Sequence, residues 1–221
     1  MKETGLIFNG EMVRAILDGR KTQTRRIVKG CEGAAGFSPE WDIKNNEFFA
    51  VLGEKDHTGM NPVLGAISCP FGAVGDRIWV RETFSCIGNE DGHPVNANGD
   101  LCERENAQRI YKASAIQKPN NYGLWTSPDG FDFDGTWTPS IHMPRWASRI
   151  TLGITGVRVE RLNDISDADG RAEGCWRGRG FGSPDLAVSP ADEFPTLWAS
   201  IYGAESWQAN PWVWVIEFRR I

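Results

Sequence analysis

The C-terminal segment constrains the fold more than any other part of this sequence. Large apolar residues at positions 212, 214, 216 and 218 alternate with valines at 213 and 215, so both faces of a strand here are apolar until Glu217. A strand with two apolar faces is stable only when other elements cover both of them. The segment therefore predicts a central strand of a sheet, opened by the turn residues Asn210 and Pro211.

Shorter periodic segments accompany this strand. Apolar residues at the spacings of strands and helices predict six further elements: strands over about 5–8, 77–84 and 149–159, and helices over about 10–18, 166–173 and 197–202. Asn9 and a Ser166–Asp169 capping box can begin the first two helices, and Gly19 and Gly203 can end the first and third. The expected fold is α+β and strand-rich, a small β-barrel with a few short helices at its mouth.

Two long segments lack such periodicity. Residues 30–73 and 85–141 are rich in glycine, asparagine and proline, with turn clusters such as NEDG and SPDG in the second segment. We expect both to be irregular insertions of loops and short strands. With 221 residues in total and no internal repeat, the chain is expected to form a single domain, 1–221, that carries the two insertions.

Composition and charge exclude several classes of protein. No apolar run approaches the length that spans a bilayer, and the N-terminal residues lack the apolar stretch of a signal peptide. A cytoplasmic protein without a membrane partner is therefore expected. Five cysteines without a CxxC pair and only three histidines are a poor ligand set, so neither a metal nor another cofactor is expected. The net charge of −5 argues against a general nucleic-acid coat protein.

One basic segment opposes this acidic average. Between Arg14 and Lys29 six basic residues accompany one acid, Asp18, which gives a local charge of +5. Such a cluster attracts phosphate or another anion. A solvated edge strand, protected by its charges from unwanted pairing, is the alternative interpretation. Because the acidic excess lies in 85–141 and 162–205, a small or local target fits this chain better than broad nucleic-acid binding.

Lys21 and Thr24 in this segment suggest nucleophilic chemistry. A hydroxyl group attacks weakly unless a base removes its proton, and a lysine can act as that base once its pKa is lowered. Neighbouring arginines favour the neutral amine and so lower this pKa. On a flat strand Lys21 and Thr24 would point to opposite faces, so the chain has to bend here if both side chains enter one pocket.

Two further segments carry candidate binding residues. Arg81 and Glu82 close one expected strand, either as an ordinary ion pair or as a pair that lines the mouth of a pocket. Arg145, Trp146 and Arg149 lie together in the segment HMPRWASR. An aromatic face beside guanidinium groups is a usual way to hold a nucleobase and its phosphate, whereas a tryptophan buried under a loop is the alternative.

In combination these motifs resemble a known family. The order GRKTQTRR, GDRIWVRETF, ITGVRVERLNDISDADGRAEG and WVWVIEF is similar to that of the ASCH domain family of the PUA-like superfamily, particularly its longer phage and prophage members. The similarity covers about 5–29, 74–84 and 142–221, so both insertions lie outside the family core. The resemblance implies a small closed β-barrel with a cleft suited to RNA or a modified nucleoside. A phage or prophage origin would place the protein in the cytoplasm of a bacterial host.

One branch of this family comprises acetylcytidine amidohydrolases, which remove an acetyl group from the exocyclic amine. Their catalytic lysine, threonine and glutamate match Lys21 and Thr24 in GRKTQT and Glu173 in RAEG. The resemblance thus implies a metal-independent hydrolase in which Lys21 deprotonates Thr24, whose oxygen attacks the acyl carbonyl. Glu173 would orient the lysine or bind the substrate amide, and Arg26 or Arg81 would stabilise the oxyanion. The expected substrate-binding set is completed by Arg20, Glu82, Arg145, Trp146 and Arg149.

Three other functions stay open at this point. Another branch of the family cleaves RNA, so a ribonuclease could use the same cleft, with Lys21 and the arginines stabilising charge on phosphate. A binding module without turnover could read RNA or a modified base through Trp146 and the basic segment. An interaction or structural protein of a phage particle is the last alternative. The sequence favours an enzyme that acts on a nucleoside or a short RNA element.

Overall fold

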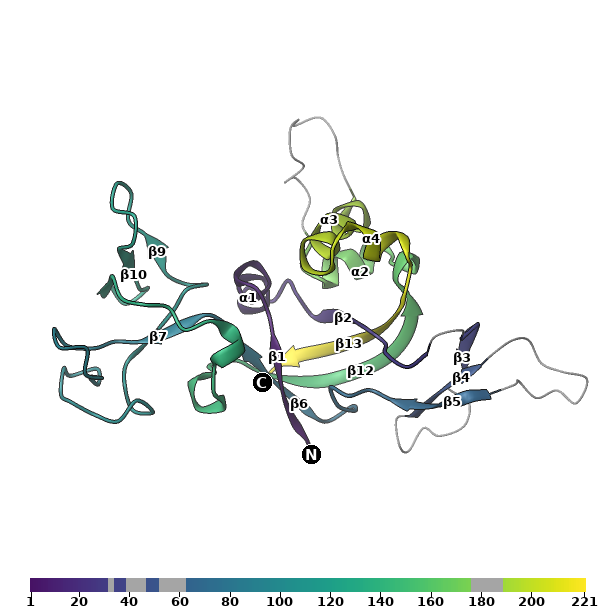
Figure 1. Cartoon of the computed structure of the whole chain (residues 1–221), viewed down its shortest axis with the longest axis horizontal. Coiled ribbons are helices and arrows are strands. Elements are labelled where there is room, and N and C mark those ends of the chain that lie inside the picture. The colour runs from purple at the N-terminus through teal and green to yellow at the C-terminus, as the bar shows by residue number, and fades with distance from the viewer. Residues whose placement is uncertain (32–33, 39–46, 52–62, 176–188) are drawn as a thin grey trace, which may run out of the picture. The chain divides into compact units, whose positions relative to one another are not determined.

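The chain forms an α+β fold in which strands predominate (Figure 1). The computed structural model describes residues 1–31, 34–38, 47–51, 63–175 and 189–221. The chain divides into two compact units, each made from separate segments. The first unit comprises Met1–Lys2, Gly19–Arg77 and Gly153–Arg219, and the second comprises Glu3–Asp18, Ile78–Leu152 and Arg220–Ile221. The two expected insertions therefore belong to different units.

The largest sheet has five strands, and the C-terminal strand is inside it. Across the sheet these are β1 (Glu3–Ile7), β6 (Arg77–Arg81), β12 (Thr151–Arg161), β13 (Trp212–Arg220) and β2 (Gln23–Ile27). Residues Val213 to Ile216 of β13 are all buried, so the predicted central strand with two apolar faces is confirmed. A barrel closes only when its two edge strands pair, and within the described ranges no pairing joins β1 to β2. The prediction of a closed barrel is therefore wrong, whereas the strand-rich α+β class is confirmed.

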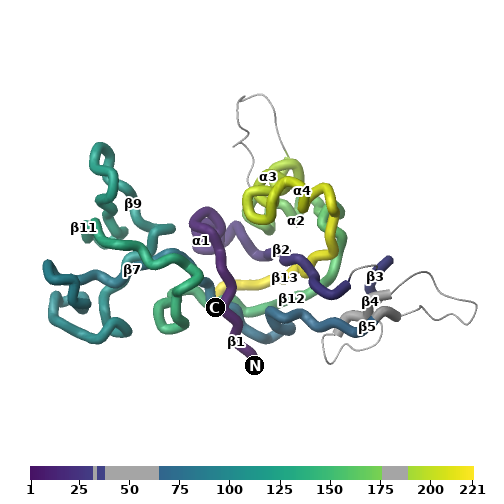
Figure 2. Tube along the Cα trace, in the orientation of Figure 1, coloured from purple at the N-terminus to yellow at the C-terminus, as the bar shows by residue number. Residues whose placement is uncertain are grey.

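In the first unit three helices cover one face of β12, β13 and β2 (Figures 1 and 2). They are α2 (Asp167–Ala172), α3 (Pro190–Tyr202) and α4 (Ala204–Gln208). An apolar cluster holds helices and sheet together: Leu162, Cys175, Phe194, Trp198, Val213 and Val215. The first insertion adds a small antiparallel sheet of β3 (Gly36–Ser38), β4 (Glu47–Val51) and β5 (Val63–Ser68).

Two capping boxes begin the helices of the first unit. The predicted box of Ser166 and Asp169 is present at α2. A second box, made by Ser189 and Asp192, begins α3 several residues before the predicted start of this helix. Gly203 ends α3 as expected, with a positive φ of 88° that few other residues adopt without strain.

The second unit contains α1 (Gly10–Leu17) and the second insertion. The Asn9 side chain accepts a hydrogen bond from the Met12 backbone N–H at 2.8 Å, so the predicted cap is confirmed. The insertion forms short strands: β7 (Phe84–Cys86) with β8 (Arg109–Tyr111), and β9 (Ile116–Gln117), β10 (Trp125–Thr126) and β11 (Asp132–Phe133) in a three-stranded sheet. Short 3-10 helices follow at η1 (Ser140–His142) and η2 (Arg145–Ala147) here, and at η3 (Leu162–Asp164) in the first unit. None of the described helices is long and apolar enough to cross a membrane.

Gly170 of α2 lies against the start of α3, and its replacement tests this packing. A Cβ atom at position 170 would lie 2.6 Å from the Pro190 carbonyl carbon and 2.7 Å from its oxygen, so backbone has to move. In an isolated helix Gly→Ala stabilises by about 1 kcal/mol. Here we expect Gly170→Ala to lower the free energy of unfolding by about 2 kcal/mol, measured by urea denaturation.

The matched control is Gly65→Ala in β5, where an added methyl group meets no atom within 4 Å. We expect it to change the free energy of unfolding by no more than about 0.5 kcal/mol. Equal stability of Gly170→Ala and the wild type would contradict the close packing of α2 on α3.

Candidate functional site

A buried ion pair joins two residues that the sequence singled out. The Lys21 Nζ atom lies 2.7 Å from Glu173 Oε2 and 2.8 Å from the Glu173 backbone oxygen, although the residues are 152 positions apart. The side chains are 0% and 2% exposed, respectively. Lys21 precedes β2, and Glu173 is the C-cap residue of α2. The Thr22 backbone N–H donates to the Ala172 carbonyl at 2.8 Å, which fixes strand and helix beside the pair.

The surroundings of Lys21 lower the pKa of its amine. Burial has the largest effect and lowers the pKa of the Lys21 amine below its ordinary value. The Glu173 carboxylate opposes this effect through its charge and its hydrogen bond, whereas the charge of Arg26 adds to the lowering. The lowering expected from neighbouring arginines is thus present, but burial contributes more. A lysine with a lowered pKa loses its own proton more readily. Only the unprotonated amine can then act as a general base and accept a proton from another group.

Glu173 is shared between two buried cations. Arg25 Nη1 lies 3.3 Å from Glu173 Oε1, on the other side of the carboxylate from Lys21. Arg25 Nη2 lies 3.0 Å from Glu160 Oε2, and the Arg25 side chain is 0% exposed. The Glu173 carboxylate is therefore fixed by a charged partner on each oxygen.

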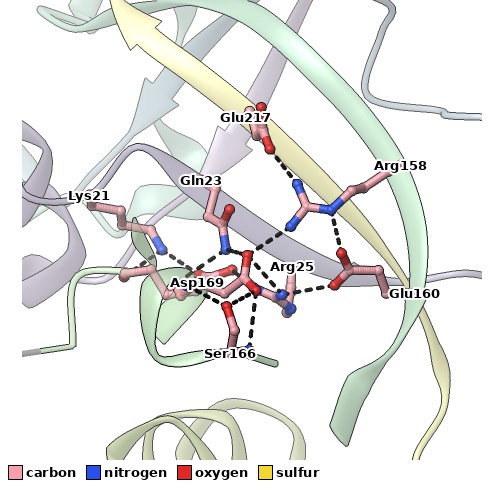
Figure 3. Close-up of polar contacts among 9 residues, drawn as sticks. Lys21, Gln23, Arg25, Arg158, Glu160, Ser166, Asp169 and Glu217 are labelled. Carbon is pink, nitrogen blue, oxygen red and sulfur yellow. Dashed lines mark hydrogen bonds and ion pairs between the residues drawn. The ribbon is translucent and has the colours of Figure 1, made fainter. Parts of the chain in front are cut away.

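The chain of charges continues outward to the surface of the first unit (Figure 3). Arg158 Nη2 lies 2.7 Å from Asp169 Oδ1, and its other nitrogens pair with Glu160 and Glu217. Exposed fractions rise along this path, from 18% at Asp169 to 34% at Arg158 and 47% at Glu217. Positive and negative groups thus alternate between solvent and the buried amine of Lys21.

Thr24 lies on the other face of β2. Gln23 donates to Asp169 Oδ1 at 3.1 Å and Arg25 pairs with Glu173, so these two side chains face α2. Side chains alternate along a strand, and Thr24 therefore points away from the helix. Its hydroxyl forms no hydrogen bond with Lys21 or Glu173, all three being described residues.

The other two candidates of the basic segment are Arg26 and Arg20. Arg26 is half-buried, and its Nη1 donates to the Tyr202 hydroxyl at 3.4 Å. Arg20 is half-buried in the turn between α1 and β2.

In the second unit Glu82 forms its own buried ion pair. Arg149 Nε and Nη2 lie 2.9 and 3.0 Å from the two Glu82 carboxylate oxygens, and Arg149 also donates to Ser114 Oγ at 2.8 Å. The guanidinium group stacks on the Tyr111 ring at 4.1 Å. Strand β6 ends at Arg81, and the Glu82 N–H donates to the Met143 sulfur at 3.2 Å instead of extending the strand. The predicted continuous strand over 77–84 is therefore divided.

The remaining binding candidates of the second unit also have partners within the chain. Arg81 donates to backbone carbonyl groups of η1 and does not form the ion pair with Glu82 that the sequence suggested. Arg145 Nε lies 3.1 Å from Glu3 Oε2. Trp146 is half-buried, and the Arg109 guanidinium group lies 5.3 Å from its ring centre. One stacking position on Trp146 is thus taken by Arg109.

No metal-binding arrangement is apparent in the described ranges, where no group of three or more His, Cys, Asp or Glu side chains could hold an ion. No protein-family model matches the chain, and comparisons with curated proteins and with solved structures give no match. The chemistry of the site therefore has to be argued from its own geometry.

Sequence reasoning did not single out four members of the charged network: Arg25, Arg158, Glu160 and Glu217. The pattern contains a signal for three of them. Arg158 and Glu160 are two residues apart in β12 and so share a face, and Glu217 interrupts the apolar alternation of β13. Opposite charges at such positions on neighbouring strands favour cross-strand pairing.

Replacing Lys21 with methionine tests the lowered pKa of the amine. Between the folded-state pKa and the unfolded value of about 10.4, the native amine is neutral and the unfolded amine binds a proton. Unfolding takes up this proton, so the wild-type free energy of unfolding gains with rising pH in this window. We expect urea denaturation at a series of pH values to show the wild type gaining stability relative to Lys21→Met as the pH rises towards about 10.4.

Lys118→Met is the matched control, since Lys118 is a 42% exposed lysine that is also ion-paired, with Asp132. We expect it to change the free energy of unfolding by no more than about 1 kcal/mol. The same pH dependence in both variants would contradict the special environment of Lys21.

Proposed function

We propose that this chain is an ASCH-like hydrolase that removes an acyl group from a modified cytidine-type nucleoside. The observation that carries the proposal is the Lys21 amine, which is buried, fixed by Glu173 at 2.7 Å and lowered in pKa. A lysine of this kind is suited to metal-independent acyl hydrolysis, because a lowered pKa makes the neutral amine, which is the general base, more available. The resemblance of GRKTQTRR, WVRE and WVWVIEF to the ASCH motifs supports the same assignment.

In the proposed reaction Lys21 removes a proton from the nucleophile as its oxygen adds to the acyl carbonyl. The proton then passes to the exocyclic nitrogen, the C–N bond breaks, and the acid and the free nucleoside leave. Glu173 orients the amine through its hydrogen bond with the Lys21 Nζ atom. Because the amine is 0% exposed, the substrate has to displace neighbouring side chains to reach it. Since Thr24 points to the other face of β2, water is the favoured nucleophile.

The charges around Lys21 favour a neutral substrate over RNA. Four carboxylates and three cations make up the network: Glu160, Asp169, Glu173 and Glu217 with Lys21, Arg25 and Arg158. A phosphate group would have to compete with these carboxylates for the arginines. The ribonuclease alternative is therefore less well supported than hydrolysis of an uncharged acylated nucleoside.

The proposal predicts that the purified chain releases acetate and cytidine from acetylcytidine without added metal. We expect Lys21→Met to lower kcat by about 100-fold or more, because the general base is removed. Lys29→Met is the control, since Lys29 is an exposed lysine of the same basic segment and should leave kcat unchanged. Chromatography of cytidine over time measures both rates.

Each alternative function has its own outcome in these assays. Absence of cytidine, or full activity of Lys21→Met, would refute the hydrolase assignment. Cleavage of RNA at low salt without metal would support the ribonuclease, and a tight complex without product that Trp146→Ala weakens would support a binding module. Thr24→Val separates the two nucleophiles: activity is retained when water attacks and lost when the hydroxyl does.

A further inference from the structure

The two carboxylate oxygens of Asp169 serve different elements. Oδ2 accepts hydrogen bonds from the Ser166 backbone N–H at 3.1 Å and from Ser166 Oγ at 2.6 Å, which completes the capping box of α2. Oδ1 accepts from Gln23 Nε2 at 3.1 Å and from Arg158 Nη2 at 2.7 Å, and it lies 3.5 Å from Arg25 Nη2. One oxygen therefore caps the helix while the other fixes it to β2 and β12 (Figure 3).

The position of Glu173 depends on this attachment. Helix α2 has six residues, and a helix so short is not stable without tertiary contacts. The Glu173 backbone N–H donates to the Asp169 carbonyl at 2.8 Å, and Gln23 Nε2 donates to the same carbonyl at 3.2 Å. Glu173 is thus one helical turn from Asp169 and directly bonded to it, so a displacement of Asp169 moves the carboxylate that holds Lys21.

We propose that Asp169 is a positioning residue for the Lys21–Glu173 pair. It holds α2 against β2, and it shares Arg25 with Glu173 so that Glu173 Oε2 stays directed at the amine. The effect of Asp169 on catalysis rests on the proposed hydrolase function. The effect of Asp169 on the pKa of the Lys21 amine is independent of that function.

Electrostatics give the direction of the effect. Without the charge of Asp169, Arg25 has one carboxylate partner fewer and interacts more strongly with Glu173. The ion pair between Glu173 and Lys21 is then weaker. Loss of a nearby negative charge also disfavours the protonated amine. Both changes lower the pKa of Lys21 further, and the other charged or titratable groups that act on this amine are Arg26 and Cys175.

Asp169 itself stays ionised throughout such an experiment. Burial alone would raise its pKa, but hydrogen bonds from Ser166 and Gln23, with the charge of Arg25, hold the pKa of Asp169 well below its ordinary value. A change with pH therefore reports on Lys21 and not on titration of Asp169.

The chain provides a closely matched control in α3. Asp192 completes the same capping box, with Ser189 N and Oγ 3.2 and 2.9 Å from its Oδ2. Within the ranges that the structure describes, Asp192 forms no ion pair. Asp169→Asn and Asp192→Asn therefore each weaken one capping box, but only the first also removes a charge from the Lys21 network.

The experiment follows the Lys21 amine by NMR, with lysine labelled at 13Cε and the Lys21 signal assigned by its loss in Lys21→Met. In Asp169→Asn we expect the titration midpoint of Lys21 to fall by about 0.5 pH unit or more, and in Asp192→Asn to match the wild type. Acetylcytidine hydrolysis is measured in parallel. We expect kcat of Asp169→Asn to fall by about 10-fold with KM within about twofold, and the acidic limb of its pH–rate profile to move to lower pH.

The outcomes separate the two proposals. An unchanged midpoint in Asp169→Asn, or an equal fall in Asp192→Asn, would overturn the positioning role. If the wild type hydrolyses nothing while the midpoint still falls only in Asp169→Asn, the hydrolase function fails and the positioning role stands. Should Asp169→Asn not fold, Gln23→Met removes the two hydrogen bonds that Gln23 donates to Asp169, leaves the Arg25 contact, and changes no charge. A smaller fall of the midpoint is then expected, and no fall would overturn the proposal.

Discussion

A lysine amine that is removed from water requires a compensating carboxylate, and much of the first unit can be understood from this requirement. Burial of an ion costs several kcal/mol unless charge and hydrogen bonds replace the lost solvent. Glu173 provides this compensation for Lys21, but Glu173 is itself buried and lies against the equally buried Arg25. The guanidinium group of Arg25 in turn needs further carboxylates, and Arg158 balances these in the next layer. The alternation ends only where the side chains reach solvent, so the network is a consequence of one buried amine.

The same requirement changes how the positive charge of residues 14–29 is interpreted. A local charge of +5 over residues 14–29 predicts attraction for anions if the charges are at the surface. Lys21 and Arg25 are instead buried and neutralised by acids from β12 and α2. Part of the positive charge therefore serves to attach a six-residue helix to the edge of a sheet. Less positive charge is therefore left to bind phosphate. The most distinctive chemical group of the unit is the buried Lys21 amine, whose pKa is lowered.

Local patterns were sufficient to predict several parts of the structure. The central strand follows from two apolar faces, and the caps of α1 and α2 follow from Asn9 and from Ser166 with Asp169, because these interactions span only a few residues.

Contacts between distant segments could not be predicted from local patterns. The open order of the sheet and the pairing of Glu82 with Arg149, 67 positions away, depend on how strands meet, and no local pattern specifies that. Thr24 is an intermediate case: strand alternation indicated the opposite face from Lys21, whereas the family resemblance implied one shared pocket.

The Lys21–Glu173 pair and the Arg149–Glu82 pair differ in what they can do. Arg149 holds Glu82 through two hydrogen bonds and stacks on Tyr111, and a guanidinium group keeps its proton at every pH at which a protein is folded. That pair can organise structure or bind a ligand, but its guanidinium group cannot act as a general base. A lysine amine can, once burial has lowered its pKa, and Lys21 is held in this condition by one carboxylate on a helix that other charges fix in place. In the proposed function Lys21 therefore carries the proton transfer, and its rate should depend on every contact that keeps Glu173 directed at the amine.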